Sequence, residues 1–361
     1  MQPLRSVRPT TTRLTLAALA AVSLAGCSLS SPQETASSGE ETQSGSQSVT
    51  LTLVTHDSFA LSEGILEGFE ADTGIQVELV APGDGGELAN QLVLTKDSPL
   101  GDVVYGIDNT YASRAVDAGV FLPYTSPNAA ADQDTFDGNL TAIDQGDVCL
   151  NIDPSYFEEA SLAEPVTLED IAEPEYAALT VVINPATSSP GMAFLLATIG
   201  EFGEDGWQDY WKQLLDGGAK VADGWSDAYY VDFSGSADSQ GTYPIVVSYG
   251  SSPAAEIGDD GQPRTASLPD TCFRQVEYAG ILAGTEHEAE AQQLVDFLLS
   301  DTVQDDIPGS MYMYPVSATA TLPDEWAQFA PLASNPIEVD PALISEKRSQ
   351  WLEEWLALVS E

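Results

Sequence analysis

Histidine is the side chain best suited to exchange protons near neutral pH, and this chain of 361 residues has only two, His56 and His287. His287 lies among the glutamates of segment 286–290, a pattern typical of a solvated helix face. The sequence has no GxSxG, HExxH, P-loop or GxGxxG motif. We therefore expect a binding protein without a cofactor rather than an enzyme. A hydrolase that uses two carboxylates stays open, because acidic residues occur throughout the chain.

The first 27 residues have the pattern of an export signal. Three arginines and no acidic residue precede an apolar stretch over residues 14–24. Its last residue begins the tetrad Leu24-Ala25-Gly26-Cys27. The stretch is shorter than the roughly 20 residues that span a bilayer. The final tetrad resembles a bacterial lipobox, so we expect residues 1–26 to be a lipoprotein signal peptide and Cys27 to carry the lipid. The alternative is an ordinary signal peptide with a chance cysteine.

Residues 27–48 are rich in Ser, Gly, Gln, Glu and Thr, a composition that favours a disordered tether. We expect the folded body to begin at residue 49 and to be held by its lipid at the outer face of the cell membrane. The remaining cysteines, Cys149 and Cys272, would then face an oxidising exterior, and we expect a disulfide between them. Two buried thiols are the alternative. No cysteine motif or Cys/His cluster suggests a metal site.

The charge of the chain is strongly negative. It has 57 acidic and 11 basic residues, for a formal net charge of −46. The electrostatic field of such a negative protein repels nucleic acid and attracts cations, so we expect no nucleic-acid partner. Recruitment of a cationic ligand is one interpretation. Because the acidic residues are spread along the chain, solubility or salt adaptation is the simpler one.

Strand and helix patterns alternate along the body, which predicts an α/β fold with parallel strands and right-handed crossovers. In the first part we expect strands at 49–55, 75–80 and 102–105 and helices at 62–72, 87–95 and 110–118, with Ser62 as the N-cap of the first helix. Further on we expect strands at 179–183, 244–248 and 275–282 and helices at 192–199, 207–215, 286–300 and 343–358. Loops at the carboxyl ends of the first strands, 56–59, 82–86 and 106–109, are expected to hold a ligand.

Seven short strings, in chain order, resemble the thiamine-binding component of bacterial ABC importers, a family with the type 2 periplasmic-binding-protein fold. They are Thr55–Phe59, Val80-Ala81 with Asp84-Gly85, Asp102–Val104 with Gly106–Asn109, Thr187–Gly191, Gly224–Tyr229, Ser248-Tyr249 with Ser251–Ala254, and Met313–Val316. The strings extend over nearly the whole body, from about residue 49 to 358.

The resemblance implies a two-lobed fold, each lobe a sheet flanked by helices, with the ligand in the cleft between the lobes. Lobe 1 would comprise 49–146 and 274–361, and lobe 2 would comprise 147–273. The implied role is an extracytoplasmic receptor, expected to be a monomer, that binds thiamine or its phosphates and delivers it to a permease.

The resemblance also implies a set of ligand contacts. Trp225 and Tyr249 would offer ring faces to a cationic ligand. Asp84 would accept from an amine or offset the positive ring, and Gly85 would let the backbone approach the ligand. Ser188 and Ser189 precede a helix whose unpaired amides would seat a hydroxyl or phosphate. The remaining expected contacts are His56, Asp57, Ser58, Gly250, Ser251, Ser252, Pro253 and Tyr312.

Two positions depart from the family pattern. His56 and Tyr312 stand where the family has other aromatic residues, which leaves a thiamine precursor or phosphate open as the ligand. Two receptors of the same fold are alternatives. The adjacent phenols Tyr229 and Tyr230 could bind ferric ion, and the acidic chain could bind a polyamine. A lipid-anchored surface enzyme or adhesin is the alternative of a different class.

Overall fold

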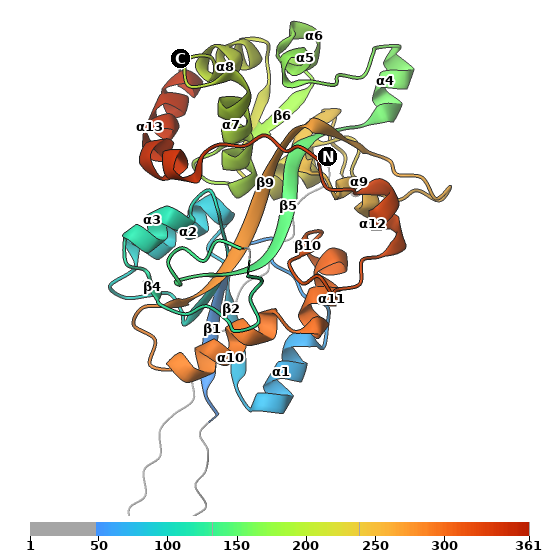
Figure 1. Cartoon of the computed structure of the whole chain (residues 1–361). Coiled ribbons are helices and arrows are strands. Elements are labelled where there is room, and N and C mark those ends of the chain that lie inside the picture. Colours follow the sequence, from blue (N-terminus) through green and yellow to red (C-terminus); the bar gives the residue numbers. More distant parts are fainter. Residues whose placement is uncertain (1–47, 132, 238, 361) are drawn as a thin grey trace, which may run out of the picture. The chain divides into compact units, whose positions relative to one another are not determined.

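The computed structural model describes residues 48–131, 133–237 and 239–360 (Figure 1). The expected signal peptide, most of the tether and Cys27 lie outside the described residues. The described residues form one continuous sheet with the strand order β2–β1–β3–β9–β5–β8–β6–β7, while β4 pairs with β9 and β10 with β5. The strands are β1 (Thr50–Thr55), β2 (Gln76–Val80), β3 (Val103–Asp108), β4 (Phe121–Leu122), β5 (Thr141–Ile152), β6 (Thr180–Ile183), β7 (Lys220–Ala222), β8 (Ile245–Tyr249), β9 (Ala266–Leu282) and β10 (Tyr314–Pro315).

Helices flank this sheet and follow many of its strands. They are α1 (Ile65–Thr73), α2 (Gly85–Leu94), α3 (Ala112–Asp117), α4 (Pro154–Ala160), α5 (Leu168–Ala172), α6 (Pro174–Ala177), α7 (Ser189–Phe202), α8 (Trp207–Asp216), α9 (Ser252–Ala255), α10 (Glu288–Leu298), α11 (Asp301–Ser310), α12 (Asp324–Phe329), α13 (Pro341–Val359) and the π-helical turn η1 (Asp227–Asp232). Within the described ranges, none of the helices is long and apolar enough to cross a membrane.

Both ends of the sheet are parallel, as the alternating pattern predicts. Strand β1 pairs in parallel with β2 and β3, and β6 pairs in parallel with β7 and β8. The long strands β5 and β9 run antiparallel to each other between these two ends (Figure 1). Within each parallel group, the loops that follow the carboxyl ends of the strands therefore lie at the same edge of the sheet.

The sequence prediction missed β5 and made β9 too short. The reason is that β5 carries polar residues that look unsuited to a buried strand. In the fold their side chains have distant partners: Asp144 accepts a hydrogen bond from the Tyr105 hydroxyl, and Asp147 forms an ion pair with Arg274 of β9. Buried polar groups are tolerated when they are paired in this way.

Two helix starts also differ from expectation. Helix α1 begins at Ile65 with Gly64 as its N-cap, so the prediction of Ser62 as the cap is wrong. Gly64 has a φ of 93°, a conformation that glycine adopts more readily than other residues. Helix α2 begins at Gly85, two residues before the predicted start, because the Asp84 side chain accepts a hydrogen bond from the Gly85 amide.

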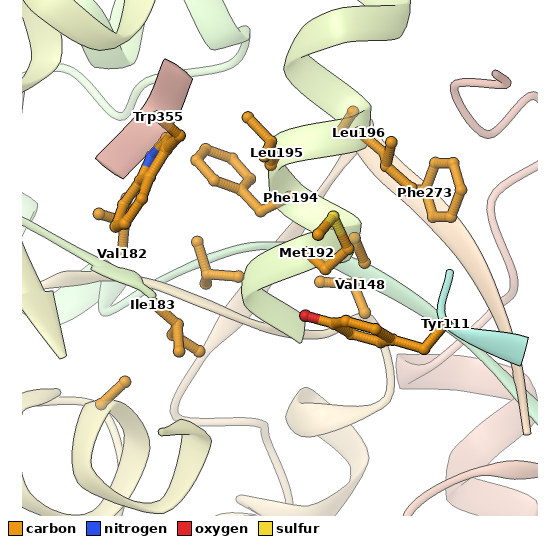
Figure 2. Close-up of a cluster of buried hydrophobic side chains, with 14 of the residues drawn as sticks. Tyr111, Val148, Val182, Ile183, Met192, Phe194, Leu195, Leu196, Phe273 and Trp355 are labelled. Atoms are coloured by element: carbon orange, nitrogen blue, oxygen red, sulfur yellow. The ribbon is translucent and has the colours of Figure 1, made fainter. Parts of the chain in front are cut away.

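Helix α7 lies at the centre of the larger core. Residues 189–199 are all buried, which explains why this helix is apolar on every side. Figure 2 shows Met192, Phe194, Leu195 and Leu196 of α7 among side chains from the sheet and from α13. The Trp355 ring of α13 lies 5.5 Å from the Trp211 ring of α8 in an edge-to-face arrangement.

The expected disulfide is confirmed. Cys149 in β5 is bonded to Cys272 in β9, with 4.1 Å between their Cα atoms. The two cysteines are 123 residues apart in sequence but lie on adjacent strands. Both are buried, so the bond fastens the two long strands to each other inside the protein.

Candidate functional site: a pocket lined by aromatic rings and carboxylates

A pocket of about 510 Å³ lies where the loops after β1, β2, β6 and β7 meet the end of β8. Most of the residues expected from the sequence line it. They are His56, Asp57, Ser58, Asp84, Gly85, Ser189, Trp225, Tyr249, Ser252 and Tyr312. Two of the three expected loops, 56–59 and 82–86, contribute residues to the lining. The third, 106–109, contributes none, since its first three residues belong to β3; a Cβ atom on Gly106 would lie 2.2 Å from the His56 ring.

Four expected residues, Ser188, Gly250, Ser251 and Pro253, lie outside the lining. They have structural contacts instead. Ser188 is the N-cap of α7, and its hydroxyl accepts a hydrogen bond from the Gly191 amide. The Ser251 hydroxyl donates to the Tyr312 carbonyl at 2.5 Å.

Several lining residues were not among the expected contacts. They are Ala60, Pro190, Ser226, Tyr229, Tyr230, Ala237, Ala255, Glu256, Glu277, Ser310, Met311 and Met313. Tyr229 lies within a string that carries the family resemblance, so it could have been chosen. Glu277 lies within a long strand, and no local signal marks it as facing a pocket.

Asp84 joins three segments of the chain at the pocket. Its Oδ1 accepts hydrogen bonds from the amides of Gly85, at 2.5 Å, and Ser189, at 3.2 Å. Its Oδ2 accepts from the Trp225 amide at 3.0 Å. Burial raises the pKa of Asp84, and the hydrogen bonds from Trp225 and the other donors oppose that rise. The Ser188 side chain is a further hydrogen-bond partner of this carboxylate, so Asp84 is tied to both serines at the start of α7.

Glycine is required where these segments meet. A Cβ atom on Gly85 would lie 2.0 Å from the Ser189 hydroxyl, and one on Gly86 would lie 2.5 Å from the backbone of Thr187. The amide of Glu87 donates to the Thr187 carbonyl at 2.9 Å across the same contact. The start of α2 is therefore held directly against the start of α7.

Trp225 is the centre of an aromatic cluster in the pocket wall. Its ring is stacked on Tyr229, with centroids 5.2 Å apart and planes at 15°. The rings of Tyr230 and Tyr249 lie near its edges, at 5.2 Å and 6.1 Å. The Trp225 indole N–H donates to the Ser248 hydroxyl at 2.9 Å, which fixes the ring orientation. One face of the indole is thus covered by Tyr229, so a ligand ring must use the opposite face.

Glu256 places a second carboxylate beside this cluster. Its Oε1 accepts a hydrogen bond from the Tyr229 hydroxyl at 3.2 Å, and its Oε2 accepts from the Ala237 amide at 2.9 Å. Glu256 lines the pocket although only 8% of it is exposed. The tyrosine that supports Trp225 is therefore itself held by a negatively charged group.

His56 and Glu277 form an ion pair in the pocket wall, with 3.4 Å between His56 Nε2 and Glu277 Oε2. Burial by itself lowers the pKa of His56. The nearby carboxylates of Glu277, Asp84 and Asp144 outweigh this effect, so the pKa rises to about 9. His56 is therefore a cation at neutral pH. The Glu277 Oε1 atom accepts a hydrogen bond from the Gln275 amide group at 3.0 Å.

The His56–Glu277 pair should make stability depend on pH. The pKa of His56 is 6.5 in the unfolded chain and about 9 in the fold, so the stabilisation is complete below pH 6.5 and is lost as pH rises through 9. Relative to His56→Gln, the free energy of unfolding of the wild type should fall by about 3 kcal/mol across this range. Urea unfolding at several pH values measures it. An unchanged difference between the two proteins would contradict the raised pKa.

The start of α7 differs from the sequence-based expectation of unpaired amides facing a ligand. The Ser189 amide donates to Asp84, and the Gly191 amide donates to Ser188 Oγ at 3.4 Å. The Ser189 hydroxyl is buried in the pocket wall and donates a hydrogen bond to the buried Asp108 carboxylate, which opposes the rise that burial causes in the pKa of Asp108. Within the described ranges, no group of three or more His, Cys, Asp or Glu residues is placed to hold a metal ion.

Comparison with known proteins places the chain in a family. Residues 98–336 match the family of bacterial extracellular solute-binding proteins. The thiamine-binding periplasmic protein of Escherichia coli (strain K12) is 31% identical over 321 residues, which cover 86% of this chain and 93% of that protein. The protein of the same name from Brucella suis biovar 1 (strain 1330) is 28% identical, covering 86% and 92%.

Solved structures agree with the two-lobed α/β fold that the sequence resemblance implied. A periplasmic thiamin binding protein aligns with a TM-score of 0.76 at 28% identity, covering 86% of this chain and 96% of that one. Iron-bound HitA of Pseudomonas aeruginosa aligns with a TM-score of 0.64 at 22% identity, a likeness of fold. From the matched family and these relatives, the chain belongs to the bacterial extracellular solute-binding proteins.

Proposed function

We propose that this chain is an extracytoplasmic receptor that binds thiamine, or one of its phosphates, and delivers it to the permease of an ABC importer. The names of its relatives, which match 86% of the chain, support this role. The observation that carries the proposal is the pocket itself, in which the aromatic pair Trp225 and Tyr229 shares the lining with the carboxylates of Asp84 and Glu256. Thiamine joins a flat aminopyrimidine to a permanently cationic thiazolium, so ring faces and negative groups both complement it.

Calorimetric titration tests this proposal. The full-length protein, unfolded in guanidinium and refolded to remove retained ligand, should bind thiamine with a stoichiometry of one. Ferric ion and spermidine serve as the competing ligands. A visible charge-transfer band on addition of ferric ion would indicate coordination by Tyr229 and Tyr230, which also line the pocket. Heat from spermidine or iron in the absence of heat from thiamine would contradict the proposal.

We propose that the protein acts as a monomeric carrier that leaves its ligand chemically unchanged. The relatives named as binding proteins support this. Mass spectrometry of ligand recovered after prolonged incubation should return the input compound, and light scattering should give the mass of one chain. A product of different mass would contradict the first statement, and a dimer mass would contradict the second.

We also propose two lobes that move relative to each other on binding. The sequence assigns 49–146 and 274–361 to lobe 1 and 147–273 to lobe 2. The contact of α13 with α8 suggests one amendment, that the last helix moves with lobe 2. In a ligand-free, open crystal structure, α13 should keep its position on α8 while its distance from β1 changes. Movement of α13 together with β1 would contradict the amendment.

The anchor is proposed from the sequence of the first 27 residues, which lie outside the described ranges. Cys27 is the expected site of acylation, so Cys27→Ser should be released from the membrane or incorrectly processed. Fractionation of cells that produce wild type or variant measures this. Equal amounts of both proteins in the membrane fraction would contradict the lipid anchor.

A further inference from the structure

Three acidic residues lie side by side across neighbouring strands next to the pocket. Asp108 of β3 and Asp144 of β5 both lie opposite Glu277 of β9 in the strand register. A bulge on each side produces this alignment, because Gly106 is an extra residue in β3 and Ile143 an extra residue in β5. All three acidic residues are buried, with at most 3% of each exposed. Like charges in such opposed positions are unfavourable, so the three groups need compensation.

Two of the three carboxyl groups have partners that stabilise a buried negative charge. Asp108 Oδ1 accepts hydrogen bonds from the Thr110 amide at 2.8 Å and the Thr110 hydroxyl at 2.6 Å. Burial raises the pKa of Asp108 to about 6, so this group is mostly ionised at pH 7. Glu277 is paired with the cationic His56 at 3.4 Å and accepts from the Gln275 amide group at 3.0 Å.

Asp144 is compensated by a proton instead. Its Oδ2 accepts from the neutral Tyr105 hydroxyl, while its Oδ1 is buried without a donor among the described residues. The carboxyl groups of Asp144 and Glu277 are hydrogen-bonded to each other, which requires a proton between them. Burial, and next the charge of Glu277, raises the pKa of Asp144 well above its usual range. Asp144 is therefore the neutral acid that donates to Glu277.

The other groups around Asp144 are consistent with this assignment. Tyr249 of β8 is a neutral phenol, because burial raises its pKa well above the usual range. The residue of β10 opposite Asp144 is Pro315, which does not titrate. His56 is a cation and is paired with Glu277. At neutral pH, His56, Glu277 and Asp144 together thus have no net charge.

We propose that Asp144 is a positioning residue that acts through Glu277, and that binding of a cationic ligand releases the proton of Asp144. The inference rests on the proposed function, because thiamine carries a permanent positive charge. Glu277 lines the pocket, so a bound cation attracts negative charge on both members of the acid pair. The O–H bond of Asp144 breaks, its electron pair stays on the carboxylate, and the proton passes to the buffer. A second negative charge then faces the ligand's cation through Glu277.

Calorimetric titration with thiamine at pH 7, in buffers of different ionisation enthalpy, tests the inference on the stripped, full-length protein. Wild type should release about 0.5–1 proton per thiamine bound, so its affinity should rise about three- to tenfold per pH unit near pH 7. Binding of thiamine without proton release overturns the inference and leaves the proposed function intact. Absence of thiamine binding overturns the proposed function and the inference with it.

Two variants identify the source of the proton. Asp144→Asn keeps the shape and a donor toward Glu277 but cannot titrate, so it should bind thiamine with release of less than about 0.2 proton. Asp227→Asn removes a charge from an exposed residue outside the lining, and it should release as many protons as wild type. Wild-type release from Asp144→Asn would assign the proton to another group and overturn the inference, and so would loss of release in both variants.

Infrared difference spectroscopy decides the question without a variant, in case Asp144→Asn does not fold. Thiamine has no carbonyl group, so a change in the carbonyl region reports on the protein. Binding to the wild type should remove the band of one protonated carboxyl group. A spectrum in which this band is unchanged by bound thiamine overturns the inference.

Discussion

Replacing Trp225 with alanine should weaken thiamine binding by a factor of tens to several hundred, or about 2–4 kcal/mol. The substitution removes a ring face for stacking and its attraction for a cation. It also removes the stacking partner of Tyr229 and the indole donor to Ser248. The backbone amide of residue 225 still reaches Asp84, so the loop keeps its contact with the rest of the pocket. Calorimetry with ligand-stripped protein measures the loss.

Trp225→Phe is the matched control for this prediction. Phenylalanine keeps an aromatic face toward the pocket and toward Tyr229, and loses the hydrogen bond to Ser248. We expect it to bind thiamine less than tenfold more weakly than wild type, since a single neutral hydrogen bond contributes about 1 kcal/mol. If alanine bound thiamine as tightly as wild type, the ligand would have to lie elsewhere. If phenylalanine lost as much as alanine, the hydrogen bond rather than the ring face would matter.

Local sequence signals predicted the parts of the site that depend on short-range structure. Asp84 was expected as a ligand contact in a glycine-rich turn, and it lies in the lining of the pocket, whereas its role as the N-cap of α2 was not predicted. The loop after β1 was predicted because a β-rich run ends at Thr55, immediately before His56 and Asp57. The pairing of Cys149 with Cys272 followed from an even number of cysteines in an exported protein, and the structure confirms it.

Long-range contacts explain what could not be predicted. Glu277 lies opposite Asp144 of β5 in the strand register, and its meeting with His56 joins residues more than 200 positions apart. A sequence pattern shows that β9 is a strand, and it gives no sign of which face borders a pocket. The occupied amides of α7 are another such case. Ser188 and Ser189 look like an anion site in sequence, and the competing acceptor, Asp84, comes from a helix start 105 residues earlier.

Removing the disulfide should have the second large effect, on stability. Closing a loop across a sequence separation of 123 residues reduces the entropy of the unfolded chain, so loss of the bond should lower the free energy of unfolding by about 4 kcal/mol. Urea unfolding of Cys149→Ala/Cys272→Ala against wild type measures the difference. Reductant should destabilise the wild type and leave the double variant unchanged. If wild type and double variant unfolded at the same urea concentration, the bond would have no role in stability.

The same double variant separates stability from ligand binding. Neither cysteine lines the pocket, and the partners of Asp84, namely Gly85, Ser189 and Trp225, all belong to other segments. At low temperature, where the variant is still folded, its Kd for thiamine should therefore stay within about threefold of wild type, a change of well under 1.4 kcal/mol. A loss of affinity as large as that of Trp225→Ala would contradict this, because it would mean that the bond between β5 and β9 sets the geometry of the pocket.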